Sequence, residues 1–415
     1  MNTHEHRPRL VQKLGLLGSL YVAQHIPLTF VYEALPVFLR QQNVSLTMLG
    51  LLQLLALPLV FKFLWSPLID RFGVTRWGHY RFWIVCFQTL LAIAIAVLAF
   101  TPITQRFMAV LMALLLVTLL SASQDIATDA LAVGLLTPAE RGLGNGIQRG
   151  GNSLGAVIGG GGMLILLDRW GWQAALLAMA GVLGLALIPV LRHRERISPA
   201  TDASSGASFQ RLIGVFRRPG MGRWLVILVL YSIGPYMALT MFRPLLVDLG
   251  LSLGEIGLML GVVSYGAGMI GAIAAGLSMA RLGRKRSLLG FSTLQIVAIV
   301  AYGLPTLGLT ALPLLYLVAI VTQLINAMAM TALFTVMMDN SDAATAGTDY
   351  TVQSSVVYIS GILGATCSGV IAETLGYQGV FAVALGFTLI TLLAISQLFH
   401  PQPQPDDLSQ SQLHL

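Results

Sequence analysis

The chain has 415 residues, of which 56% are hydrophobic and only 10% are charged, with a formal net charge of +7. A soluble domain carries about 25% charged residues, so this composition excludes a globular protein surface that faces water on all sides. It fits a surface that is largely covered by lipid.

Apolar stretches long enough to cross a bilayer recur along the whole chain. A spanning helix needs about 20 mostly apolar residues. Such segments lack the alternation of barrel strands, and a backbone in hydrocarbon must satisfy its own hydrogen bonds, so we expect helices. The sequence therefore predicts an all-α membrane protein with twelve transmembrane helices. The predicted spans are 13–39, 41–61, 82–100, 107–124, 150–167, 170–191, 224–242, 256–280, two within 287–338 separated by a turn at Leu307–Pro313, 350–373 and 374–399.

Basic residues are distributed unevenly among the predicted loops. Of the 24 Lys and Arg, 18 lie in the N-terminal segment and in the loops after the second, fourth, sixth and eighth spans, whereas Arg40, Arg106 and Arg169 lie in the opposite loops. By the positive-inside rule, both termini are expected to be cytoplasmic, in a multi-pass protein of a bacterial inner membrane. This distribution also argues against a nucleic-acid-binding patch.

An internal repeat divides the chain into two halves. Residues 137–176 overlay 342–381 at a shift of 205 without a gap, and Gly171 then meets Gly376. A parallel repeat of this kind predicts two six-helix bundles joined by a polar loop. The expected division is 1–191 for the N-terminal bundle, 192–222 for a cytoplasmic linker, 223–400 for the C-terminal bundle and 401–415 for a cytoplasmic tail.

Two six-helix halves around a long basic loop resemble the major facilitator superfamily, whose members have a Gly-x-Leu-x-Asp-Arg-x-Gly-Arg-Lys/Arg motif after helix 2. The first half shows Ser66–Gly73 and the second shows Gly276–Arg286, with Ala280 in the place of the acid. Asp70 is thus the expected gating carboxylate, closing the cytoplasmic side through an ion pair or a helix-end contact. A solvated loop charge is the alternative. The gating candidates are Asp70, Arg71, Gly73, Arg281, Gly283 and Arg284.

Further segments narrow the resemblance. Phe63–Asp70 and Ser123–Ala130 are similar to the AmpG muropeptide permeases, while Tyr21–Gln24 and Ala34–Gln42, together with the chain length, are similar to the siderophore permeases RhtX and FptX. This resemblance implies a monomer that imports a ferric siderophore, such as a pyochelin-like chelate, by proton symport. The iron would travel inside the substrate, so no protein metal site or cofactor is expected. A muropeptide permease and a small-molecule exporter remain the alternatives.

Two carboxylates on the fourth span are candidates for proton coupling. Asp125 and Asp129 are four residues apart, so they share one helix face. Charged groups within a span are costly and face a cavity or a partner, and two nearby carboxylates disfavour each other's ionisation. The competing interpretation is structural neutralisation by Arg149 on the next span. Glu33 and His25 are further candidates, although Glu33 could pair with Arg243 and His25 could be a packing residue.

Other polar side chains on the predicted spans form a candidate substrate cavity. Aromatic faces, amides and cations suit a bulky anionic ligand, although each tyrosine could instead be a packing residue or an interface anchor. The sequence shows no P-loop, nucleophile elbow or HExxH motif, so we expect no enzyme. The substrate-binding candidates are Tyr21, Tyr32, Gln148, Arg149, Asn152, Tyr236, Arg243, Gln323, Asn326, Gln353 and Tyr358.

Overall fold

The structure, a computed structural model, describes residues 6–41, 55–73, 77–102, 107–193, 209–342 and 345–399. Within these residues every regular element is helical. The elements are α1 (His6–Thr29), η1 (Phe30–Ala34), α2 (Leu35–Gln41), α4 (Leu57–Phe61), η3 (Lys62–Leu64), α5 (Ser66–Arg71), α6 (His79–Leu98), α7 (Phe107–Leu135), α8 (Arg141–Val157), η5 (Ile158–Gly162), α9 (Met163–Arg192), α10 (Phe209–Arg217), α11 (Met221–Asp248), α12 (Leu253–Ile256), η6 (Gly257–Val263), α13 (Ser264–Leu282), α14 (Arg284–Gly303), η7 (Leu304–Leu307), α15 (Leu312–Asp339) and α16 (Ala346–Leu398).

Among the described residues, nine continuous helical stretches are long and apolar enough to cross a membrane. Two of them, Arg141–Arg192 and Ala346–Leu398, are each a pair of spans. Their backbones turn at Gly171 (φ 75°) and Gly376 (φ 68°), a left-handed conformation that favours glycine. The predicted span 41–61 lies largely outside the described residues. The prediction of an all-α membrane fold is confirmed.

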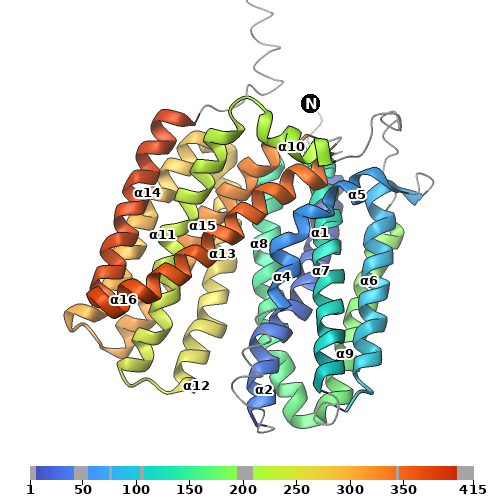
Figure 1. The fold of residues 1–415 in the computed structure, drawn as a ribbon, viewed down its shortest axis with the longest axis horizontal. Helices are drawn as coiled ribbons and strands as arrows, with labels where there is room; N and C mark the ends of the chain where they lie inside the picture. The colour runs from blue at the N-terminus through green and yellow to red at the C-terminus, as the bar shows by residue number, and fades with distance from the viewer. Residues whose placement is uncertain are drawn as a thin grey trace, which may run out of the picture.

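The helices form two bundles that lie side by side, with α1–α9 in one and α11–α16 in the other (Figure 1). Helices α8 and α13 pack against each other between them, and α16 also contacts α5 and α7 of the first bundle. Helix α10, within the predicted linker, lies at the end of the molecule where the N-terminus enters. We call this end the linker end; it is the end that the positive-inside rule predicts to be cytoplasmic.

The predicted repeat is visible in how equivalent glycines pack. A Cβ at Gly159 would meet the backbone of Ile26 on α1, and a Cβ at Gly364 would lie 2.8 Å from the carbonyl oxygen of Ile233 on α11. Small residues permit such close approach of spanning helices. A similar helix–helix contact therefore occurs once in each half, through two glycines that the shift of 205 residues superposes.

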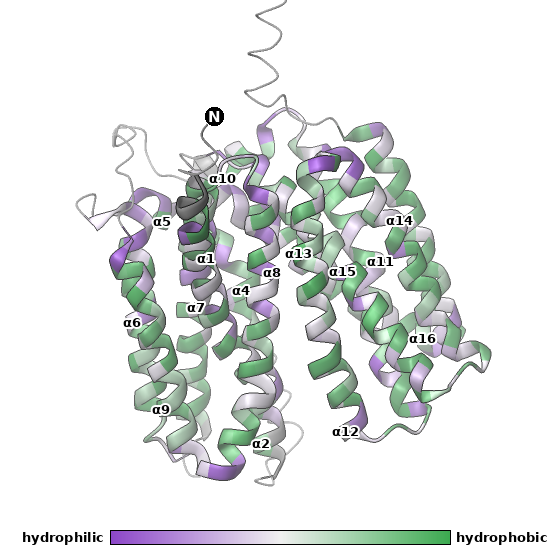
Figure 2. Cartoon of the chain, turned by 180° about the vertical axis from the view of Figure 1, so that it is seen from behind, coloured by the Kyte–Doolittle hydropathy of each residue, from purple (hydrophilic) through white to green (hydrophobic). Residues whose placement is uncertain are grey.

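Two spans lose regular α-helical geometry near polar side chains. In the first, η1 is a π-helical segment that follows Pro27 and holds Tyr32 and Glu33. In the second, the 3₁₀ turn η3 begins at Lys62 and is followed by α5, with Pro67 in its first turn. Proline interrupts helical hydrogen bonding, and π-segments are frequent at functional sites. Figure 2 shows hydrophilic residues at the linker end and also part-way along several of the helices.

Candidate functional site

A buried ion pair joins the second and fourth spans. The ammonium group of Lys62 contacts one oxygen of Asp125, and the side-chain amide of Gln24 on α1 donates to the other. Lys62 is only 1% exposed, so its charge depends on this partner. Removing one member of a buried pair costs about 3–5 kcal/mol, because the other charge is left uncompensated.

Asp129, one turn further along α7, is held by neutral donors. Its Oδ1 accepts hydrogen bonds from the hydroxyl of Tyr21 at 2.9 Å and from the amide of Gln148 at 3.1 Å. Gln148 in turn accepts from the hydroxyl of Tyr350 on α16 at 3.5 Å. Asp129 is 2% exposed, and this chain of hydrogen bonds links it to the C-terminal half.

Arg149 is not the ion-pair partner of either aspartate, contrary to the structural alternative drawn from the sequence. Its guanidinium lies over the ring of Phe334 on α15, 4.3 Å from the ring centroid. It acts on Asp129 only through the longer-range field. Its Nε has no hydrogen-bond partner among the described residues. Arg149 is therefore a half-buried cation that contacts an aromatic ring, and its Nε–H is available to donate a hydrogen bond.

Tyrosines from both halves gather next to the ion pair. The Lys62 ammonium lies 5.8 Å from the centroid of the Tyr358 ring. Tyr358 is 42% exposed, and Tyr236 on α11 lies near it. Tyr32 on η1 also lies near Tyr358, and its hydroxyl has no partner among the described residues. Three predicted substrate-binding tyrosines thus lie around one region between the halves.

Glu33 does not pair with Arg243. Its carboxylate accepts a hydrogen bond from Tyr265 on α13 at 2.9 Å, across the two halves, whereas Arg243 is exposed. A carboxylate within a span needs a donor, and a tyrosine of the opposite bundle supplies it. His25 is half-buried, and its Cβ packs against Gly155 of α8. It lies within electrostatic range of Asp125 and Arg149.

The predicted amide residues occupy different places. Gln353 is fully buried near the linker end, where its amide bonds to the backbone oxygens of Met337 and Asp349 and its carbonyl accepts from Trp224 at 2.6 Å. It is thus occupied by its own half and lies outside the candidate site. The amides of Gln323, Asn326 and Asn152 are half-buried, and the Oδ1 of Asn326 has no described hydrogen-bond partner.

At the linker end, Asp70 lies at the amino end of α16. Its carboxylate accepts hydrogen bonds from the backbone amides of Gly347 at 3.0 Å and Thr348 at 2.7 Å, from the hydroxyl of Thr348 at 2.6 Å and from Tyr80 at 2.9 Å. The first amides of a helix lack intrahelical partners and carry partial positive charge. Asp70 therefore ties the N-terminal half to the C-terminal half.

Asp339 makes a second connection at the same end. It pairs with Arg141 of α8 at 2.9 Å and with Arg284 of α14 at 2.6 Å. Arg284 also donates to the carbonyl oxygen of Pro138 at 2.5 Å. One carboxylate thus neutralises an arginine from each half. Sequence reasoning selected Arg284 but missed Arg141 and Asp339, because nothing in either motif places them opposite each other.

The remaining gating candidates lie around these contacts. Gly283 has φ 74° and forms the turn into α14. A Cβ at Gly73 would overlap the ring of His79. Arg281 and Arg71 are exposed, and the Arg71 guanidinium lies 5.1 Å from the ring of Phe72. Both arginines are exposed at the surface of the linker end.

A third contact at this end lies within the N-terminal half. Lys13 of α1 donates to Glu140 at 2.8 Å. Partial burial raises the pKa of Glu140. The hydrogen bonds from Lys13 and from the backbone of Thr137 lower this pKa by more, so it lies below its usual value. The carboxylate is therefore stabilised in its charged form.

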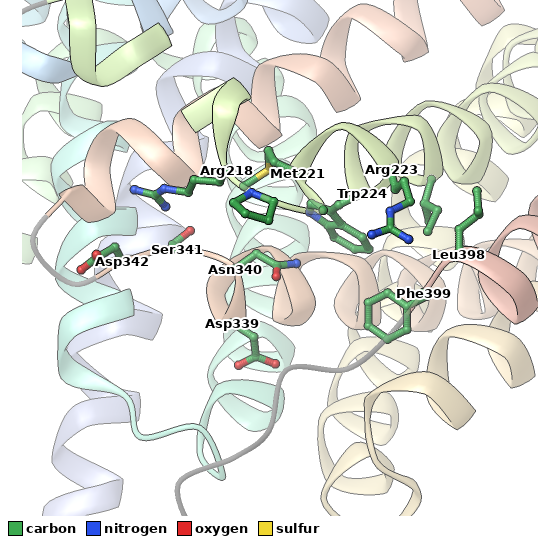
Figure 3. A pocket seen from close by; sticks show the side chains of 13 residues that line it. Arg218, Met221, Arg223, Trp224, Asp339, Asn340, Ser341, Asp342, Leu398 and Phe399 are labelled. Atoms are coloured by element: carbon green, nitrogen blue, oxygen red, sulfur yellow. The ribbon is translucent and has the colours of Figure 1, made fainter. Parts of the chain in front are cut away.

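A pocket of about 610 Å³ lies at the linker end, and neither Asp125 nor Asp129 lines it. Figure 3 shows Arg218, Arg223, Trp224, Asp339 and Phe399 around it. Arg218 also pairs with the buried Asp349 of α16 at 2.5 Å. Asp339 and Arg218 both belong to contacts at the linker end, so this pocket belongs to that contact region. It is separate from the buried group of Lys62, Asp125, Asp129 and their hydrogen-bond partners, which we call the central cluster.

Sequence reasoning missed several members of the central cluster. Lys62 was visible as a cation within an apolar span, and that position alone signals a buried partner. Gln24, Tyr350 and Tyr265 gave no such signal, because neutral polar side chains on a helix become functional only through what faces them. The structure brings Tyr21 and Gln148 into hydrogen bonds with Asp129, a contact between helices that helical spacing alone did not predict.

This arrangement of two six-helix bundles with buried charges between them defines the class of the protein. Residues 17–365 match the Major Facilitator Superfamily, and the chain belongs to that superfamily. Its fold is that of a membrane transporter, and nothing in the match indicates an enzymatic activity.

Among known proteins, the chain is similar to the anhydromuropeptide permease of Escherichia coli strain K12, with 30% identity over 392 residues that cover 92% of this chain and 79% of the permease. A putative transporter named AmpG 4 from Rickettsia conorii is 22% identical over 392 residues, covering 92% and 93% of the two chains. These relatives agree with the AmpG resemblance of 63–70 and 123–130.

Solved structures of transporters share the fold. The fucose transporter FucP in its outward conformation aligns with a TM-score of 0.71 and 13% identity, covering 95% of this chain and 100% of FucP. A bacterial homologue of the iron transporter ferroportin in its outward-facing state aligns with a TM-score of 0.67 and 17% identity, covering 94% and 99%. At these identities the likeness concerns the fold alone.

The prediction of a ferric-siderophore importer is wrong. The relatives found over nearly the whole chain are anhydromuropeptide permeases and AmpG transporters, not siderophore permeases. That prediction depended on two short segments of the first span and on chain length, and neither contains a group that binds a chelate. The alternative drawn from 63–70 and 123–130, a muropeptide permease, fits these relatives better.

Proposed function

We propose that this protein is an inner-membrane permease that imports anhydromuropeptides into the cytoplasm by alternating access, coupled to protons. The observation that carries the proposal is the 30% identity to the E. coli anhydromuropeptide permease over 92% of the chain. The relative's length is covered to 79%, so the similarity includes both halves of the transporter and the region between them.

The side chains between the halves suit the chemistry of such a substrate. A muropeptide combines sugar rings with a short peptide, so it offers apolar ring faces, hydroxyls, amides and carboxylates. Tyr32 and Tyr358 supply aromatic faces, and the Tyr32 hydroxyl bonds to none of the residues that the structure describes. Arg149 supplies an unused donor beside Phe334. A site that is mostly apolar and aromatic, with few convergent polar groups, is typical for small molecules.

Proton coupling is supported by the two aspartates on α7. Asp129 is 2% exposed, and the half-buried Asp125 lies one helical turn before it on the same face of α7. A carboxylate held in low dielectric, next to another carboxylate, can be protonated at less acidic pH than in water. Such a group can take up a proton from one side of the membrane and release it to the other.

Alternating access is supported by where the contacts between the halves lie. Asp70 with Thr348, and Arg141 with Asp339, join the halves at the linker end. Toward the opposite end, the hydrogen bonds described between the halves include that from Tyr265 to Glu33. With the linker end cytoplasmic, this arrangement corresponds to a state closed to the cytoplasm. Import then requires these linker-end contacts to break.

Uptake in proteoliposomes tests the proposal. The purified full-length chain is reconstituted, and accumulation of a radiolabelled anhydromuropeptide is measured with and without an inward proton gradient. We expect accumulation that a protonophore abolishes, with empty liposomes as the control. Absence of both gradient-driven uptake and counterflow of the labelled compound would refute the proposed substrate.

A further inference from the structure

The proposed function leaves one charged residue of the central cluster without a role. Lys62 lies on the broken second span, where η3 interrupts the helix between α4 and α5. Among the described residues, the ion pair of Lys62 with Asp125 is the only one that joins the second span to the fourth. If this ion pair served only the fold, both of its members could be replaced by apolar residues at little cost in stability.

Lys62 lies between two different neighbours. On one side it contacts the carboxylate of Asp125, whose other oxygen is held by Gln24. On the other side it faces the ring of Tyr358, which belongs to the C-terminal half and is 42% exposed. The cation thus lies next to an exposed aromatic ring of the opposite half.

The two aspartates differ in what holds them. Asp129 is bound by Tyr21 and Gln148, which are neutral donors. Asp125 is bound by a full positive charge. Neutralising Asp129 would leave no cation behind, whereas neutralising Asp125 would leave Lys62 buried without a counter-charge. Protonation of Asp125 therefore creates a demand for a new anion at that position.

We propose that Lys62 is the receptor for a carboxylate of the substrate, and that protonation of Asp125 makes it available. In this exchange a proton adds to the Asp125 carboxylate, the ion pair opens, and a substrate carboxylate takes the place of Asp125 beside the ammonium. When the substrate leaves, Asp125 releases the proton to water and pairs with Lys62 again. This inference rests on the proposed function, because it needs an anionic substrate.

The exchange keeps the charge of the cluster constant. One proton and one substrate carboxylate are taken up, so the Lys62–Asp125 cluster has the same net charge before and after the exchange. Each ligand thereby favours the other, and this reciprocal coupling is what a proton symporter requires. Other titratable or charged groups lie around this pair on the neighbouring helices. They are Tyr21 and His25 on α1, Asp129 on α7, Arg149 on α8, Tyr236 on α11, and Tyr350 and Tyr358 on α16.

Binding of two matched probes to the purified full-length protein tests the proposal. One is a radiolabelled anhydromuropeptide with free peptide carboxylates, and the other is the same compound with those carboxylates amidated. We expect the wild type to prefer the carboxylate probe, and more strongly at acidic pH. Lys62→Gln should lose this preference, with about 10- to 100-fold weaker binding of the carboxylate probe. Binding of the amidated probe should change little.

Asp125→Asn should have the opposite effect. With Lys62 permanently without its partner, the preference for the carboxylate probe should persist but no longer increase at acidic pH. Gradient-driven accumulation should be lost, while counterflow in proteoliposomes should continue. The double variant Lys62→Gln, Asp125→Asn keeps volume and neutrality, so it controls for misfolding. It should bind both probes equally, independent of pH.

Three results would decide against the inference. If Lys62→Gln retains the carboxylate preference, Lys62 is not the receptor. If the double variant regains gradient-driven uptake with the wild-type preference, the pair is structural only. Both results leave the proposed function intact. If the wild type neither binds nor transports the carboxylate probe, the proposed function fails, and the inference fails with it.

Discussion

The carboxylate of Asp70, on the short helix α5 of the N-terminal half, accepts a hydrogen bond from the backbone amide of Thr348 at 2.7 Å, in the first turn of α16 of the C-terminal half. A side chain of one bundle thus supplies the cap for a helix of the other. The first backbone amides of α16 have this acceptor only while the two halves are together at the linker end. Capping of α16 and closure of the transporter therefore depend on the same contact.

The first prediction concerns this contact. Asp70→Ala removes the acceptor for Gly347 and Thr348, so the linker end should open more often, with a population shift of about tenfold or more. Spin labels at the exposed positions Ala139 and Arg286, with Cys86 and Cys367 replaced by serine, report the separation of the halves. We expect longer distances in the variant. An unchanged distance distribution would show that Asp70 does not hold the gate.

The second prediction concerns the packing of α8 on α13. A Cβ at Gly146 would lie 2.8 Å from the carbonyl oxygen of Ala272, so Gly146→Leu should prevent the two halves from closing at the linker end. Transport should fall at least tenfold, by rough analogy with other blocked conformational steps. Gly266→Leu on α13 is the matched control, because open space surrounds that glycine. Equal loss of transport in both variants would contradict a specific contact.

The third prediction concerns Asp129. Asp129→Asn keeps the shape of the side chain but removes the charge that Tyr21 and Gln148 stabilise. We expect accumulation driven by a proton gradient to fall by about tenfold or more, while counterflow of labelled substrate persists. Tyr21→Phe, which removes one donor and leaves the carboxylate, should reduce accumulation less. Full gradient-driven uptake in Asp129→Asn would exclude this residue from coupling.

The fourth prediction concerns the aromatic surface. If Tyr358 packs against a sugar ring, Tyr358→Ala should raise KM by about 5- to 10-fold, whereas Tyr358→Phe should leave KM nearly unchanged. Both values come from initial uptake rates at varied substrate concentration. Tyr316 on α15 offers a control tyrosine in the C-terminal half that lies outside the cluster. A similar increase in KM for Tyr316→Ala would indicate a general packing effect.

The fifth prediction concerns pH and Glu140. Its pKa is lower in the folded protein than in an unfolded chain, so the pair with Lys13 contributes stability above the unfolded carboxyl pKa. That contribution is lost as pH falls through the lower folded pKa. Glu140→Gln should reduce stability at neutral pH by less than about 1 kcal/mol and flatten the acid limb of the Tm–pH profile. Thermal unfolding in detergent measures both. A parallel profile in the variant would mean that Glu140 does not contribute.

Much of the fold could be predicted from the amino-acid sequence, because its low content of charged residues indicates that lipid surrounds the protein. Long apolar stretches require helices in lipid, and the repeat at 205 residues required two similar bundles. The shared face of Asp125 and Asp129 likewise follows from helical spacing. These features depend only on the period of the helix and on the cost of polar groups in hydrocarbon.

The partners of the buried charges were decided only by tertiary structure. Helical spacing places Asp125 toward the interior but does not say whether Arg149 or Lys62 faces it, and the structure chose Lys62. In the same way Glu33 met Tyr265 and not Arg243. Position along a helix determines the direction of a side chain, whereas its partner depends on the rotation and depth of the neighbouring helix, which arise from the packing of whole bundles.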